Sequence, residues 1–124
     1  MRKYNPDQTP DATAWLALDE TERIELVKQA HKDTDLDFVQ LTLHATSHVT
    51  IETQIAMKLE HVVSNFDRLI KEGLGRHDAI HACAAISMEL IYKGMNGDGK
   101  EDLEAFYKKR LGELTAKNWL DQTY

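Results

Sequence analysis

Four of the six histidines form two pairs with the same spacing, His44 with His48 and His77 with His81. Residues four positions apart lie one above the other on a helix, so each pair presents two imidazoles on one helix face. Both pairs occur in segments whose apolar residues recur at helical spacing. If the two helices face each other, four imidazoles converge inside a small bundle. The spacing therefore indicates a transition-metal site, although it does not specify a reaction.

Two glutamates share these helix faces. Glu52 extends the first pair by one turn, and Glu89 follows the second pair two turns later. Either carboxylate can complete a metal shell or hold a ligating histidine in one tautomer. A di-metal centre usually requires two bridging carboxylates, so we expect a single transition-metal ion: zinc, iron or nickel. The candidate metal ligands are His44, His48, His77, His81, Glu52 and Glu89.

The same histidines also fit a core without metal. Buried imidazoles that bond to Glu52, Glu89 or backbone carbonyls would form a pH-sensitive network, because protonation near pH 6 places like charges together. The alternative to a metal-binding protein is therefore a non-enzymatic interaction or scaffold protein. The sequence identifies no catalytic residue, and we favour a non-enzymatic role.

The segment His77-Asp78-Ala79-Ile80-His81 comes close to the zincin motif H-E-x-x-H, in which the glutamate activates a zinc-bound water. Here Asp78 takes the place of the glutamate and is one methylene shorter, so it reaches such a water less well. No strand is predicted that would bind an extended peptide. A zincin-like metal-dependent hydrolase is therefore a remote alternative.

The other two histidines and the single cysteine have simpler interpretations. His31 and His61 fall near predicted helix ends, where interaction with terminal groups or exposure accounts for them. Cys83 is interpreted as a small buried hydrophobe, with a minor ligand role as the alternative. A lone cysteine cannot form an internal disulfide, which fits a reducing compartment.

Composition restricts the class of protein. The chain has 124 residues, of which 42% are apolar and 29% are charged, as in a single globular domain. A net charge of −6 argues against binding to nucleic acid or anionic lipid. The first residues lack the apolar stretch of a signal peptide, and no run is long enough to span a membrane. We expect a cytoplasmic protein with no nucleic-acid or membrane partner.

Prolines and glycines divide the chain into helical segments. Both prolines lie in the first ten residues, and most glycines cluster between segments of helical periodicity. Two shorter helical pieces are expected first, one beginning at an N-cap by Thr9 and one opening with an Asp19/Glu22 capping box. The longer helices are expected over residues 37–58, 60–72, 76–94 and from about 103 to 114.

These segments predict an all-α fold, a single-domain helical bundle of about four to five helices over residues 1–124. Residues 1–9 are expected to form an extended N-terminal arm and residues 117–124 a tail. A homodimer is the default assembly for a bundle of this size, although no sequence feature demands it.

Two blocks of the chain resemble a small bacterial family known as domain of unknown function 1841. The blocks are Leu43-His44-x-x-x-His48-x-x-x-Glu52-x-Gln54-x-Ala56-Met57 and Gly73-Leu74-x-Arg76-His77-Asp78-Ala79-Ile80-His81-Ala82, followed by Glu89. The resemblance covers roughly residues 40 to 93. It implies a helical bundle in which the two histidine pairs are the distinctive positions, and it implies no activity. A weaker likeness in pattern is to hemerythrin-type bundles, in which histidines and carboxylates surround iron.

Overall fold

The computed structural model describes residues 1–124, and all of its regular elements are α-helices. In chain order they are α1 (Ala12–Ala17), α2 (Glu20–Ala30), α3 (Phe38–Ala56), α4 (Glu60–Lys71), α5 (Arg76–Asn96), α6 (Leu103–Glu113) and α7 (Ala116–Asp121). The predicted all-α class is confirmed. The helix count is seven rather than four to five, because two helices of six residues, α1 and α7, accompany the five longer ones. Helices this short depend on caps and tertiary packing more than on periodicity.

Local capping explains where the first helices begin. At the start of α2, Asp19 accepts a hydrogen bond from the Glu22 backbone and the Glu22 side chain accepts one from the Asp19 backbone. The predicted capping box is therefore confirmed. The predicted cap of the first helix is wrong, because Asp11 and not Thr9 caps α1. The Thr9 hydroxyl instead accepts a hydrogen bond from Arg76, far along the chain.

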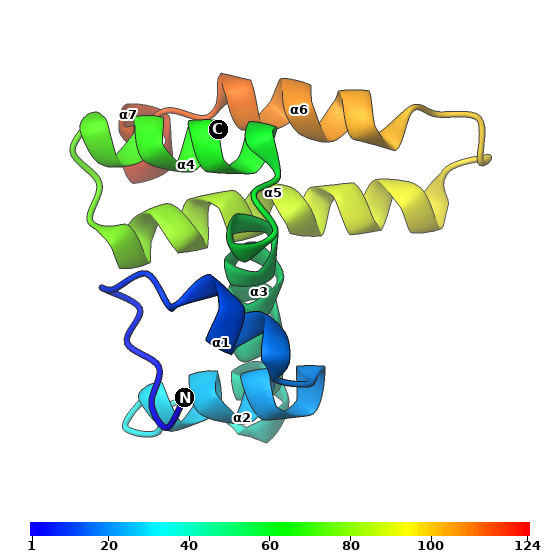
Figure 1. The fold of residues 1–124 in the computed structure, drawn as a ribbon. Coiled ribbons are helices and arrows are strands. Elements are labelled where there is room, and N and C mark those ends of the chain that lie inside the picture. Colours follow the sequence, from blue (N-terminus) through cyan, green and yellow to red (C-terminus); the bar gives the residue numbers. More distant parts are fainter.

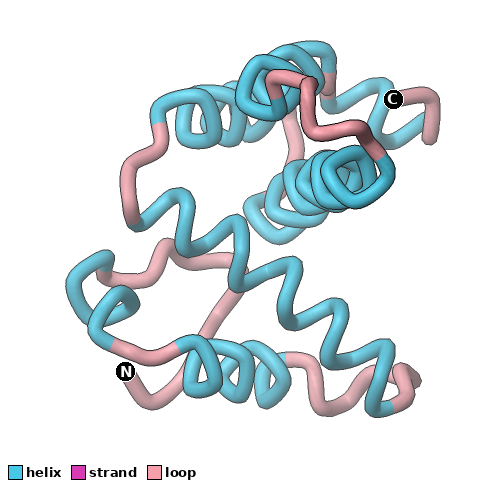
Figure 2. Tube along the Cα trace, turned by 90° about the vertical axis from the view of Figure 1, so that its right-hand side faces the viewer, coloured by secondary structure: helices cyan, strands magenta, loops and turns pink.

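The helices form two halves joined by α3 (Figure 1). In one half α4, α5 and α6 run side by side, and in the other α1 and α2 pack against α3. Figure 2 shows α3 crossing between them, with α5 seen nearly end-on. Because α3 packs against α1, α2, α4 and α5, it is the element on which both halves are assembled.

Each half has its own apolar core. The larger cluster draws mainly on α4, α5 and α6 and includes Ile51 of α3, whereas the smaller one consists of Tyr4, Trp15, Val27, Ala45 and Val49. Two polar side chains of α3, His48 and Glu52, are fully buried as well. Burying polar groups costs free energy unless they are hydrogen-bonded, so their partners define a polar layer inside the fold.

Two turns set the direction of the helices that follow them. Lys58 adopts a left-handed φ of 60° between α3 and α4, and Gly73 has a φ of 115° between α4 and α5. A residue with a side chain would be strained at position 73, so glycine suits this turn. The turn at Gly73 brings the first turns of α5, with Arg76, His77 and His81, against α3.

The chain ends lie against the two halves. Residues 1–9 contain no helix, and Tyr4 is buried between α1 and α3. At the other end, Thr115 and Asn118 form a capping box for α7, and Trp119 packs against the larger core. No helix combines the length and apolarity needed to cross a membrane.

Candidate metal centre

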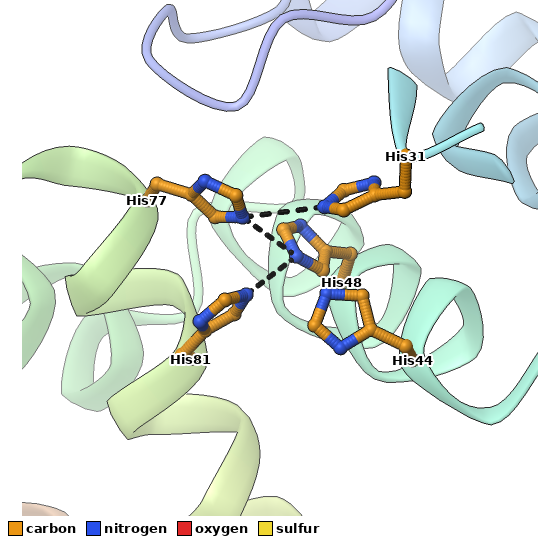
Figure 3. Close-up of side chains that lie close together, drawn as sticks. All are labelled: His31, His44, His48, His77 and His81. Carbon is orange, nitrogen blue, oxygen red and sulfur yellow. Dashed lines mark hydrogen bonds between the residues drawn. The ribbon is translucent and has the colours of Figure 1, made fainter. Parts of the chain in front are cut away.

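Five histidines meet where the two halves join (Figure 3). His31 is the C-terminal cap of α2, His44 and His48 lie on α3, and His77 and His81 lie on the first turns of α5. One ring nitrogen of each lies within 4.8 Å of the corresponding atoms of all the others. The structure therefore brings the two predicted pairs together and adds a fifth imidazole from α2.

The Nε2 atoms of four of these rings form a chain of close contacts. His48 Nε2 lies 3.0 Å from His81 Nε2 and 3.2 Å from His77 Nε2, and His77 Nε2 lies 3.3 Å from His31 Nε2. Nitrogen ligands about 2.0–2.1 Å from a zinc ion are about 2.9 Å apart at right angles and about 3.4 Å apart in a tetrahedron. The observed contacts therefore have the spacing of donor atoms around a single ion.

Hydrogen bonds on the far side of two rings determine their tautomers. His31 Nδ1 lies 2.9 Å from the Val27 carbonyl oxygen, which can only accept, so Nδ1 carries the proton. His48 Nδ1 lies 3.2 Å from the Tyr4 hydroxyl, which donates its own proton to Glu52. His48 Nδ1 must therefore also be the donor. A neutral imidazole with its proton on Nδ1 has its lone pair on Nε2, which faces the centre of the cluster here, and this is the tautomer that binds metal through Nε2.

Hydrogen bonds between the rings cannot satisfy all of the close nitrogen contacts in this cluster. A neutral imidazole with a protonated Nδ1 has one lone pair on Nε2, so His48 Nε2 can accept one good hydrogen bond. It has two close Nε2 neighbours, and so does His77 Nε2. Any distribution of single protons leaves at least one short contact without a proper donor. A cation in the centre would engage all four lone pairs at once.

Burial favours the neutral form of four of the five rings. Desolvation, followed by repulsion from the neighbouring imidazoles, lowers the pKa of His48 to about 2 and the pKa of His81 to about 4. The pKa values of His44 and His77 are also lowered, mainly by burial. The rings of these four histidines are therefore neutral at neutral pH, and each has a lone pair for a metal ion without first losing a proton.

A buried ion pair is connected to the cluster by hydrogen bonds. Arg76, at the start of α5, donates from both Nη atoms to Glu52 on α3, each at 2.7 Å. The same carboxylate accepts a hydrogen bond from Tyr4, whose pKa is raised by burial and by the charge on Glu52. Tyr4 therefore remains a neutral donor, and a chain of hydrogen bonds runs from Arg76 through Glu52 and Tyr4 to His48.

The carboxylates lie outside the group of ligand atoms. Glu52 is held by Arg76 and Tyr4, so it contacts the histidines through Tyr4 rather than facing the centre. Glu89 pairs with Arg110 of α6, where its side chain is 41% exposed. Asp78, the residue of the zincin-like segment, is exposed and does not join the cluster.

His31 is not among the metal ligands predicted from the sequence, but the structure places it in the histidine cluster. Its predicted interaction with a helix end is present, because its ring bonds to the Val27 carbonyl in the last turn of α2. It is buried rather than exposed, and its other nitrogen faces His77, 46 positions later. No local spacing links the two residues. His61 packs against Tyr107 away from the cluster, and Cys83 is buried in the larger apolar core as predicted.

Fold and site together define the chain as an all-helical protein with a cluster of five histidines at the junction of its two halves. Comparison with protein-family models, with curated proteins and with solved structures finds no match. The resemblance to domain of unknown function 1841 and the likeness to hemerythrin-type bundles therefore stay predictions from the sequence.

Proposed function

We propose that this protein binds one first-row transition-metal ion through its histidine cluster. The observation that carries the proposal is the chain of three Nε2 contacts at 3.0–3.3 Å among four buried or partly buried imidazoles. Lone pairs directed at one another at this distance repel unless a proton or a cation lies between them. Imidazole is a good ligand for zinc, nickel and iron, so an ion of this kind fits the donor set.

His31, His48, His77 and His81 are the proposed central ligands, through their Nε2 atoms. His44 is the proposed fifth ligand, because one of its ring nitrogens lies within 4.8 Å of the others. Opposite donors of a six-coordinate ion are about 4.1 Å apart, so small side-chain shifts would bring all five onto one ion. Glu52 supports His48 through Tyr4, as carboxylates commonly do around metal-bound histidines.

A binding role, as in a metal sensor or carrier, agrees with the surroundings better than catalysis does. A metal-dependent hydrolase needs a free base beside the metal-bound water. Glu52 is occupied by Arg76 and Tyr4, and Asp78 points outside the cluster into solvent. The hypothesis of a zincin-like hydrolase therefore lacks the carboxylate base that would activate a metal-bound water.

Metal content of the protein purified without an affinity tag tests the proposal. We expect close to one zinc, nickel or iron ion per chain in the wild type and a loss of that ion in the double variant His48→Ala/His81→Ala. His61→Ala is the matched control, since His61 is the one histidine outside the cluster. The control should retain the metal and the melting temperature of the wild type.

The metal-free network makes the opposite prediction for the same material. A wild type that is fully folded, contains no metal and gains no thermal stability from added zinc, nickel or ferrous iron would contradict the proposal. A chelator separates the two cases as well. If the protein holds a metal ion, the chelator should remove it and lower the melting temperature. If the histidines form a hydrogen-bonded scaffold without metal, the chelator should leave the melting temperature unchanged.

A further inference from the structure

The proposed ligand set carries no charge. All five donors are imidazoles, and an imidazole that binds a metal through a lone pair is a neutral ligand. A divalent ion held by neutral ligands keeps its full charge of +2. A charge of that size inside a protein is costly unless an opposite charge is close to it.

The protein's own buried carboxylate does not provide that opposite charge. Glu52 accepts two hydrogen bonds from Arg76 and one from Tyr4, so the positive guanidinium balances its charge. The Tyr4 hydroxyl and the His48 ring also separate Glu52 from the centre of the cluster. The Glu52–Arg76 pair therefore has no net charge and does not offset the charge of an ion in the site.

Other acidic groups act on the cluster only from solvent. Asp7 and Asp78 are near enough to His77 for their negative charges to raise its pKa, in opposition to burial. Both side chains are exposed, and neither belongs to the group of ligand atoms. Water screens charges at such positions, so they compensate an ion in the centre weakly.

The cluster has one side that faces solvent. His31 and His48 are buried, and their Nδ1 atoms are anchored on the Val27 carbonyl and on Tyr4. His44, His77 and His81 are only partly buried. An ion held between these rings is therefore enclosed on the side of α2 and Tyr4 and less covered on its solvent side, where the partly buried rings lie.

We propose that the metal-loaded site takes up a small anion as an additional ligand at a coordination position on this solvent side. The inference rests on the proposed metal binding and specifies the chemical class of what the metal in turn binds. A compact anion with a nitrogen or oxygen donor atom supplies the negative charge that the five imidazoles lack. Neutral donors of the same size should bind less well, because they leave the charge uncompensated.

Azide is a suitable probe, added to protein loaded with cobalt(II), whose visible absorption reports its ligands. We expect saturable changes in the cobalt bands on addition of azide and weaker changes with a neutral nitrogen donor of similar size, such as acetonitrile. The variant Asp7→Asn/Asp78→Asn removes the two nearby negative charges without touching a proposed ligand. It should bind cobalt somewhat less tightly, because the same two charges attract the cation. Once loaded, it should bind azide more tightly, by about twofold at low ionic strength, an effect that added salt reduces.

Asp98→Asn is the matched control, because Asp98 is an exposed acid in the loop after α5, away from the cluster. Its azide affinity should equal that of the wild type. If one cobalt ion binds and its spectrum is unchanged by a large excess of azide, the anion site does not exist, and the proposed metal binding still stands. If neither cobalt nor zinc, nickel or iron binds, the proposed function itself fails.

Discussion

At the scale of single residues, His48 is the centre of the cluster. Its Nε2 contacts both His77 and His81, and its Nδ1 is bonded to Tyr4. It is also completely buried, which is unusual for histidine. The Tyr4 hydroxyl can therefore orient the ring and fix its tautomer, although Tyr4 is 44 positions away in the chain.

Removing this hydroxyl should weaken metal binding. In Tyr4→Phe the ring can still pack on Trp15, but His48 Nδ1 loses its partner. Loss of a partner behind a metal ligand typically costs about 10- to 100-fold in affinity. Titration with zinc or nickel against a competing chelator measures this change.

Tyr107→Phe is the matched control for that measurement. Tyr107 is also a buried tyrosine whose hydroxyl donates a hydrogen bond, but its acceptor is Gln54 and not the site. Wild-type metal affinity is expected in this variant. Equal affinities for Tyr4→Phe, Tyr107→Phe and the wild type would show that Tyr4 does not orient His48.

At the scale of elements, Arg76 joins three parts of the chain. Its guanidinium pairs with Glu52 of α3, donates to the Pro6 carbonyl and the Thr9 hydroxyl in the N-terminal segment, and itself belongs to the first turn of α5. The Glu52 side chain is 0% exposed. Removing one partner of a buried ion pair leaves a charge without compensation.

We therefore expect Arg76→Ala to be strongly destabilising, by about 3–5 kcal/mol in the free energy of unfolding. Urea unfolding in the presence of a chelator measures the effect without a contribution from metal. Arg110→Ala is the control: its partner Glu89 is at the surface, so the expected loss is below about 1 kcal/mol. Equal losses in the two variants would mean that the buried pair does not hold these elements together.

At the scale of the whole molecule, the histidine cluster connects the two halves. One ligand comes from α2, two from α3 and two from α5, whereas α6 contributes none. An ion bound by all of them would tie α2 to α5, which otherwise pack on α3 from different sides. Metal binding and docking of α2 should therefore stabilise each other.

Hydrogen exchange tests this coupling. Addition of the metal should slow amide exchange in α2 more than in α6, because α2 supplies a ligand and α6 belongs to the other half. The variant His31→Ala should remove the extra protection of α2 while the remaining histidines still bind the ion. Equal slowing in α2 and α6 would show that the ion stabilises the fold without joining its halves.

The sequence by itself determined the helical class and the two histidine pairs, because both follow from interactions between neighbours along the chain. Capping boxes and i, i+4 spacing operate within one or two helical turns, so the Asp19/Glu22 cap and the shared faces of His44/His48 and His77/His81 could be read directly.

Only the tertiary structure decided which side chains meet. His31 joins the cluster because α2 packs on α3, Glu52 is held by Arg76 because α5 crosses α3, and Glu89 faces Arg110 on α6 instead. These partners lie 21 to 46 positions apart in sequence. Their contacts depend on how whole helices pack and cross, which is set by the summed burial of both cores and not by any local spacing.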